Sequence, residues 1–506
     1  MILGFFLIGN VITANVFSEQ TTLSLAWEEE KLKSDLKKYA EIIFTLDRHY
    51  ADSINVEEVI IRSIQRMLTF LDPFSTFHNK DAFRDFQLFQ SGIYSGIGAN
   101  LIEVEGKRIV HSTTLGSPAS ESGLSPGDII SAINGQKITG FSTLKVKKLL
   151  HGEKGSAVKV SVQRFGLENP LELIILRDLL PLPSIPMCLQ LKPNVVYIKL
   201  TSFSNATQIE FDECLAPHLT YLDGLILDLR DNIGGSLESG VQIADRLLNI
   251  NDLIMSTQGN SSETRNEYFA TINVKKSDFP VVVIINNKTA SSAEILAGAI
   301  KDNRRGLIIG QNSFGKGLIQ TIFPLKTGHA LFLTTGKWFT PSGINIQQNY
   351  RNLLRNRLFF SEKINQNDTE ITFQESSYKN SGVEKTGISP NIHLKAKEVS
   401  PFLVKAMLNR LFFNFSREIW FKYRKLAESE KMNGLLISEF YEFAQNRNIQ
   451  VSNEEFEKNI GYIKHQLRSN LLLMAGKPVE ASIVALKTDP YVLLAIDSLE
   501  QARSFL

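Results

Sequence analysis

The chain has 506 residues, of which 43% are hydrophobic and 21% are charged, and its formal net charge at pH 7 is +2. This composition is typical of folded globular proteins, and the length implies about three or four domains. A net charge this small excludes a broad cationic surface, so we expect no nucleic-acid partner.

The N-terminal stretch "MILGFFLIGNVITANVFS", residues 1–18, is almost wholly apolar and is followed by charged sequence. This pattern is typical of a secretory signal peptide or a short membrane anchor, although the usual basic start is missing. We therefore expect an exported protein that is periplasmic, or attached to the membrane by this segment and facing the periplasm. Whether the segment is cleaved stays open.

Four further regions follow in chain order. Residues 19–92 have apolar positions at helical spacing, as in "VEEVIIRSIQRMLTFL". Residues 93–180 change to short β-type runs between Gly and Pro turns. Within residues 181–395, buried strands alternate with helical patterns, which indicates a layered α/β core with a polar insertion at 350–386. Residues 396–506 have helical patterns. Together, these regions predict a multidomain α/β fold, with a layered α/β core, a β-rich domain and helical regions at both ends.

Two cysteines, Cys188 and Cys214, permit at most one internal disulfide, and we interpret them as small buried side chains. The eight histidines are dispersed, and none forms an HxxxH or HExxH pair. The sequence therefore predicts neither a metal site nor a cofactor.

The stretch "TASSAEILAGA", residues 289–299, runs from a polar turn into a helical pattern and places Ser291 and Ser292 at the helix N-terminus. The unpaired N–H groups there favour a negatively charged oxygen. Two interpretations are open. Ser291 can be a helix cap, because Glu294 stands at the spacing of a capping box, or it can be a nucleophile. The stretch alone favours the cap.

Downstream, "NSFGKGLIQ" places Lys316 between two glycines. Apolar surroundings disfavour the charged form of a lysine, so Lys316 is a candidate base, with a solvated loop lysine as the alternative. Gln320 follows four residues later. In a fully extended chain the two would be about 13 Å apart, so a turn or bulge is needed for the amide to orient the amine.

A third serine, Ser125, lies in "GLSPG", which satisfies the G-x-S-x-G pattern. The residue after such a serine must donate its backbone N–H to the oxyanion, and Pro126 has none. We therefore reject Ser125 as a nucleophile.

Taken together, four stretches resemble signature blocks of the carboxyl-terminal processing proteases, also called tail-specific proteases: "LDLRDNIGGSLESG", "TASSAEILAGAIKD", "RGLIIGQNSFGKGLIQTIFPL" and "FTPSGINIQ". The resemblance implies Ser291 as nucleophile, Lys316 as general base and Gln320 as the group that supports the lysine. It also implies the backbone amides of Gly235 and Ser292 as oxyanion donors. Ile233 departs from the family, which often has Pro there, so we expect a less rigid loop.

Residues 93–180 resemble a PDZ domain, with "YSGIGANL" similar to its carboxylate-binding loop. The resemblance implies that the amides of Ile97, Gly98 and Ala99 hold the terminal carboxylate of a chain that adds as a β-strand. The alternative is that the glycines only permit a tight turn. The expected partners are polypeptides with accessible C-termini, and we also expect a homodimer through the helical C-terminal domain.

Two functions follow. The first is a serine endopeptidase that captures a C-terminus through its PDZ domain and cleaves through an acyl-enzyme at a Ser-Lys dyad. The alternative is a non-catalytic PDZ scaffold or chaperone on a protease-like body. The presence of serine, lysine and glutamine together favours the enzyme.

Overall fold

The computed structural model describes residues 19–260, 265–272, 279–349, 386–394, 400–424 and 434–505. The predicted signal or anchor at 1–18 lies outside these residues, as does all but the end of the insertion at 350–386. No helix within the described ranges is both long and apolar enough to cross a membrane.

The chain divides into two compact units, residues 1–77 and 78–506. The described part of the first, residues 19–77, contains the helices α1 (Glu19–His49) and α2 (Val56–Leu68). Asn55 caps α2 by accepting a hydrogen bond from the Glu58 N–H, as expected where an Asn precedes an acidic first turn. The helical character predicted for this region is therefore confirmed. The short strand β1 (Thr76–His78) follows at the junction.

The second unit opens with α3 (Lys80–Gln90) and a small β-rich part. Its sheet has the order β3-β4-β5-β7-β8, with β6 paired to β5, while β2 and β9 form a separate two-stranded ribbon. The elements are β2 (Ile93–Gly96), β3 (Ala99–Val104), β4 (Lys107–Thr113), α4 (Pro118–Glu121), β5 (Ile129–Ile133), β6 (Gln136–Lys137), α5 (Thr143–Leu150), β7 (Ala157–Gln163), β8 (Leu171–Leu176) and β9 (Asp178–Pro181). Strand β3 lies at the edge of its sheet, where its backbone can accept a further strand.

A six-stranded sheet forms the centre of the α/β part, with the order β10-β11-β12-β15-β16-β19. Strands β11 to β19 run parallel, and only β10 is antiparallel. The strands are β10 (Met187–Lys192), β11 (Val195–Lys199), β12 (Gly224–Asp228), β15 (Val281–Ile285), β16 (Leu307–Gly310) and β19 (Ile392–His393). The continuous apolar runs predicted to be buried strands are confirmed, because a parallel sheet is covered on both faces.

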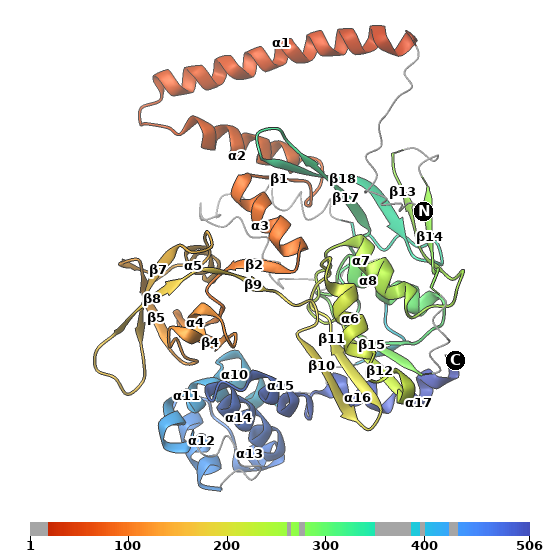
Figure 1. Ribbon diagram of the computed structural model, residues 1–506. Helices are drawn as coiled ribbons and strands as arrows, with labels where there is room; N and C mark the ends of the chain where they lie inside the picture. Colours follow the sequence, from red (N-terminus) through yellow and green to blue (C-terminus); the bar gives the residue numbers. More distant parts are fainter. Residues whose placement is uncertain are drawn as a thin grey trace, which may run out of the picture. The chain divides into compact units, whose positions relative to one another are not determined.

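Helices cover both faces of this sheet (Figure 1). Alternate strand residues such as Leu225 and Val283 pack with α6 (Thr207–Leu215), α7 (Leu237–Asp245) and α8 (Ser292–Asp302). The residues between them, such as Ile226 and Ile284, pack with α16 (Pro490–Asp497) and α17 (Leu499–Ala502). This alternation follows from the two-residue period of a strand.

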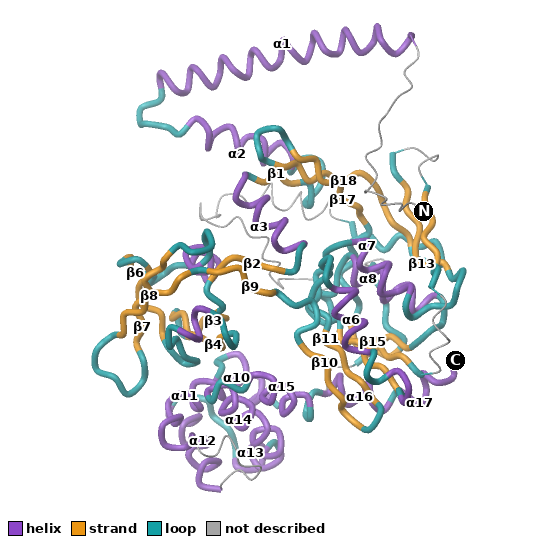
Figure 2. Tube along the Cα trace, viewed as in Figure 1, coloured by secondary structure: helices purple, strands orange, loops and turns teal. Residues whose placement is uncertain are grey.

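A second sheet contains β13 (Leu253–Gln258), β14 (Asn266–Phe269), β17 (Leu318–Pro324) and β18 (Ala330–Phe339). A bundle of helices follows, drawn in purple in Figure 2. It contains α10 (Pro401–Leu408), α11 (Leu411–Tyr423), α12 (Gly434–Asn446), α13 (Asn453–Lys458), α14 (Ile460–Met474) and α15 (Pro478–Leu486). The predicted helical region from 396 therefore has two parts. Helices α10 to α15 form the bundle, whereas α16 and α17 pack on the central sheet. The proposed homodimer through this region stays a prediction.

The interpretation of Cys188 and Cys214 as small buried side chains is wrong, and the one disulfide that the sequence permits is formed. The structure joins them in a disulfide between β10 and α6, across 26 residues of sequence. Both are only partly buried at the rim of the core. The sequence could not show this pairing, because it depends on α6 folding back onto the strand two elements earlier.

Candidate active site

Ser291 lies between strand β15 and helix α8 and has a strained backbone, with φ of 57° and ψ of −120°. A non-glycine residue rarely adopts this conformation, which costs about 1 to 3 kcal/mol and is concentrated at functional sites. A strained serine between a strand and a helix is the arrangement that exposes a nucleophilic hydroxyl. The expected capping box between Ser291 and Glu294 is present, so Ser291 is the N-cap of α8. A cap alone needs no such strain, and the strain is therefore the observation that favours a nucleophile in addition.

Glu294 connects this serine to the segment that carries Lys316. Its carboxylate is fully buried. One oxygen, Oε2, accepts hydrogen bonds from the backbone N–H of Ser291 at 2.8 Å and of Lys316 at 2.9 Å. The other, Oε1, accepts from Gly315 N at 2.6 Å and Ser313 Oγ at 2.5 Å. The backbone of the candidate nucleophile and that of the candidate base are therefore held by the same oxygen atom.

Burial raises the pKa of Glu294 above its usual range, in spite of the four donors, which act in the opposite direction. A buried acceptor with four donors is costly to build and costly to disturb, since any lost partner leaves a polar group unsatisfied.

Lys316 and Gln320 are in contact, as expected. The Lys316 Nζ donates to Gln320 Oε1 at 2.8 Å. Lys316 precedes β17, and the pairing of β17 with β18 is irregular between Ile319 and Gln320. The Lys316 carbonyl accepts a hydrogen bond from Trp338 Nε1 at 2.9 Å. The amine therefore comes from a short irregular segment fixed on both sides.

The loop after β12 carries Gly235 and reaches the start of α8. The Asn232 side chain donates through Nδ2 to the Leu200 carbonyl and accepts through Oδ1 from Gly234 N. The backbone carbonyl of Asn232 accepts from Ala290 N. A Cβ on Gly234, where φ is +95°, would lie 2.7 Å from the Ser291 Cβ. Only glycine fits between this loop and the serine.

The two amides predicted as oxyanion donors lie on either side of this contact. The site that a Cβ on Gly234 would occupy is 3.0 Å from the Ser292 nitrogen, and Ser292 Oγ donates to the Gly235 carbonyl at 3.2 Å. No described residue accepts a hydrogen bond from the backbone N–H of Gly235 or Ser292. Two N–H groups in neighbouring segments therefore have hydrogen-bonding capacity left, which is what an oxyanion site needs.

The predicted carboxylate loop of the β-rich part is built around Gly98, where φ is +84°. Its carbonyl accepts from Thr114 N at 2.8 Å, and the Ile97 carbonyl accepts from Ala119 N at 2.8 Å. Ile97 lies in one apolar core with Leu101, Val146 and Leu150, so strand β3 and helix α5 are packed side by side. The loop therefore lies at the end of an edge strand with a helix beside it.

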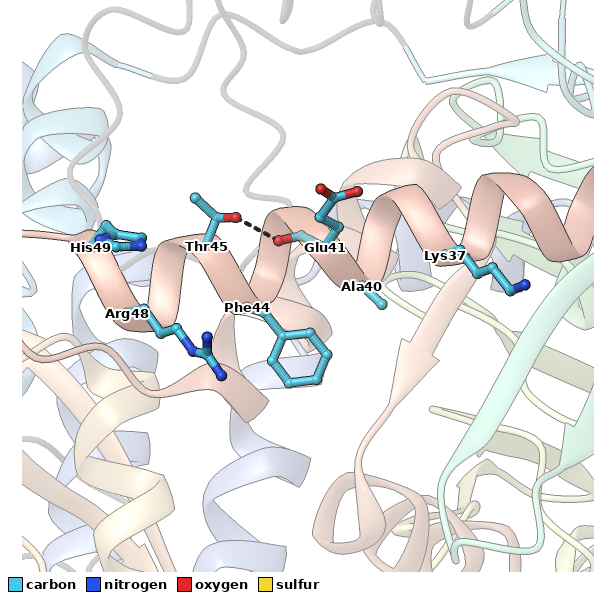
Figure 3. Close-up of a pocket in the computed structure, with 7 residues that line it drawn as sticks. All are labelled: Lys37, Ala40, Glu41, Phe44, Thr45, Arg48 and His49. Carbon is cyan, nitrogen blue, oxygen red and sulfur yellow. Dashed lines mark hydrogen bonds between the residues drawn. The ribbon is translucent and has the colours of Figure 1, made fainter.

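Other sequence expectations have simple outcomes. Ser125 lies in a turn before β5 with its N–H bonded to Asp128 Oδ2, and no helix follows it. A surface hollow of about 480 Å³ lies along α1 (Figure 3), and none of its seven lining residues is a predicted site residue.

Sequence reasoning missed three supporting residues. The sequence indicates Glu294 only as a capping partner, whereas in the structure it also binds the Lys316 segment. Asn232 lies inside "RDNIGG", and Gln347, whose Oε1 accepts from Gly317 N at 2.8 Å, lies inside "GINIQ". Their presence in these stretches was the available signal. Their partners could not be inferred, because they lie on other elements.

The chain matches known protein families and curated relatives. Residues 194–351 match the model of peptidase family S41, and residues 101–164 match that of the PDZ domain. The chain is 30% identical over 348 residues to the carboxy-terminal-processing protease of Bartonella bacilliformis, covering 68% of this chain and 79% of that protein. It is 31% identical to the carboxyl-terminal-processing protease of Synechocystis, covering 67% of this chain and 82% of that one.

The chain also resembles the solved structure of a photosystem II D1 C-terminal processing protease, with 25% identity, a TM-score of 0.39, and coverage of 72% of this chain and 93% of that one. The chain belongs to the carboxy-terminal processing proteases of peptidase family S41. It is a serine protease with a PDZ domain, within the α/β fold described above.

The Glu294 contacts predict a specific effect of Glu294→Gln. Whichever way the amide turns, its nitrogen must face at least one backbone N–H, either that of Gly315 or those of Ser291 and Lys316, so the variant should lose about 2 to 4 kcal/mol of unfolding free energy. Urea denaturation measures this. Glu238→Gln is the matched control, because Glu238 lies exposed in the first turn of α7. Equal stability of the two variants would contradict the role given to Glu294.

Proposed function

We propose that the chain is an endopeptidase that uses Ser291 as nucleophile and Lys316 as general base. The observation that carries the proposal is the shared Glu294 oxygen, which fixes the backbones of both residues. The strained conformation of Ser291 and the Lys316 to Gln320 hydrogen bond support it.

In the proposed reaction, Ser291 Oγ attacks the peptide carbonyl while neutral Lys316 takes its proton. The N–H groups of Gly235 and Ser292 stabilise the oxyanion. The C–N bond then breaks, the leaving amine receives the proton from Lys316, and an acyl-enzyme remains. Water attacks the ester, again with Lys316 as base, and regenerates Ser291. Gln320 orients the amine throughout.

The proposed dyad predicts that Ser291→Ala and Lys316→Ala each lower the rate of peptide cleavage at least about a thousandfold, because neither residue can be replaced within such a unit. Cleavage of a fluorogenic peptide measures the rate, and circular dichroism checks that folding survives. Ser125→Ala and Lys326→Ala are the matched controls and should be fully active, since neither lies at the site. Wild-type activity in either dyad variant would leave the scaffold as the better function.

We also propose that the PDZ domain captures substrates by their C-termini. The peptide would extend the sheet at β3, with its carboxylate on the amides of Ile97, Gly98 and Ala99. The edge position of β3 and the packing of α5 beside it support this. No described residue accepts from the N–H of Ile97 or Gly98, so both are able to bind an anion.

Capture at this loop predicts that Gly98→Asn weakens cleavage of peptides with a free C-terminus about tenfold or more. Asn tolerates the positive φ, but its Cβ would lie 2.2 Å from the Ser117 Cβ. Gly106→Asn is the matched control, with φ of +74° and open space around the Cβ. Mass spectrometry of paired peptides with free and amidated C-termini gives the readout. Equal cleavage of both peptides by the wild type would refute capture.

We propose that the protein is exported, either to the periplasm or to its membrane boundary. The Cys188 to Cys214 disulfide supports this, because structural disulfides are typical of oxidising compartments. Alkylation of free thiols in freshly lysed cells, followed by mass spectrometry, should find both cysteines protected in the mature protein. Complete alkylation of both would place the chain in a reducing compartment.

A further inference from the structure

A partly buried ion pair connects α16 to the loop that carries Gly235. The Arg230 NH2 group lies 2.9 Å from Asp489 Oδ2, and NH1 donates to Asp489 Oδ1 at 3.2 Å. The two residues are 259 positions apart in sequence. Asp489 also caps α16, because its Oδ1 accepts from Tyr491 N at 2.8 Å and Val492 N at 3.2 Å. This aspartate therefore belongs to two structures at once.

The other side of Arg230 is held by Asp228 at the end of β12. Arg230 Nε donates to both carboxylate oxygens at 3.0 Å, and NH2 donates to Oδ2 at 2.5 Å. Asp228 is fully buried and also accepts from Tyr197 Oη at 2.8 Å. The planar guanidinium is thus bound along two edges by two carboxylates, a geometry that fixes both its position and its orientation.

Lys199 completes this group of charges. Its Nζ donates to Asp228 Oδ1 at 3.0 Å and to the Arg230 carbonyl at 2.7 Å. The Tyr491 ring lies 4.9 Å from the Arg230 guanidinium carbon. Two carboxylates therefore balance two cations in a largely buried place. Without the charge of Asp489 the group has one cation in excess. Movement of the Arg230 side chain towards water would lower the electrostatic free energy of this unpaired charge.

Movement of Arg230 would displace the loop of residues 231–235, which carries Gly235. These residues follow Arg230 directly, and Asn232 and Gly234 contact the segment that precedes α8. The Gly235 N–H has to point at the reacting oxygen, and an oxyanion donor loses most of its value when it is displaced.

We propose that Asp489 is a positioning residue for peptide hydrolysis, holding Arg230 so that the Gly235 amide keeps its place in the oxyanion site. This inference rests on the proposed function of Gly235. It assigns to α16 a role in the reaction in addition to covering the sheet.

The test is Asp489→Asn in the full chain. Asparagine is an equally good helix cap, so α16 and the unfolding temperature should be kept while the negative charge on Arg230 is lost. We expect kcat to fall about ten- to a hundredfold with little change in KM, because the loss concerns the transition state. Asp489→Glu should recover part of kcat, since it restores the charge. Asp497→Asn, an exposed aspartate of the same helix, is the matched control and should behave as wild type.

Amide hydrogen exchange gives a second readout that does not depend on activity. In Asp489→Asn, the segment 229–236 should exchange at least about tenfold faster, while α8 keeps its protection. Wild-type kcat together with wild-type exchange in this segment would overturn the proposal. Should Asp489→Asn lower the protection of all helices equally, the residue is structural and the proposal fails. Activity in Ser291→Ala would instead refute the proposed function, while the exchange result would still report on the loop.

Discussion

The candidate active site depends on one buried carboxylate. Glu294 accepts hydrogen bonds from the backbone of the serine segment and from the backbone of the lysine segment, which follows a separate strand. A backbone hydrogen bond from Phe314 N to the Thr289 carbonyl also joins the two segments, but Glu294 binds the backbone of Ser291 and of Lys316 themselves. Four donors offset only part of the electrostatic cost of burying this carboxyl group, and the result is a rigid connection between two loops.

Rigidity matters here because the proposed dyad has only two reacting side chains. In a catalytic triad, a third side chain orients the base. Here the flexible Lys316 side chain is oriented by the conformation of the backbone around it and by the side-chain amide of Gln320. The Trp338 indole and the Gln347 side chain hold the main chain at Lys316 and Gly317, and Gln320 holds the amine. The backbone at Lys316 and Gly317 is therefore held rigidly, and the freedom that remains lies in the Lys316 side chain.

Much of the fold could be predicted from the sequence. The parallel strands were visible because a strand covered on both faces is continuously apolar, as in "PVVVIIN". The positions of Ser291, Lys316 and Gln320 came from resemblance, and the contact between the last two was an explicit expectation that the structure confirms. Pairings across elements were beyond the sequence. The Cys188 to Cys214 disulfide, the second role of Glu294 and the Arg230 to Asp489 ion pair all join residues that only the folded topology brings together.

The covering of the central sheet has a consequence for biosynthesis. Translation delivers Ser291 and Lys316 long before residues 490–502, so the face formed by Ile226, Val282 and Ile284 stays open while the remaining chain is made. An incomplete chain therefore exposes an apolar, aggregation-prone face of the sheet, and Arg230 lacks its contact with Asp489. Under the proposed role of Asp489, the loop that carries Gly235 is anchored only after α16 has been synthesised and has packed on the sheet.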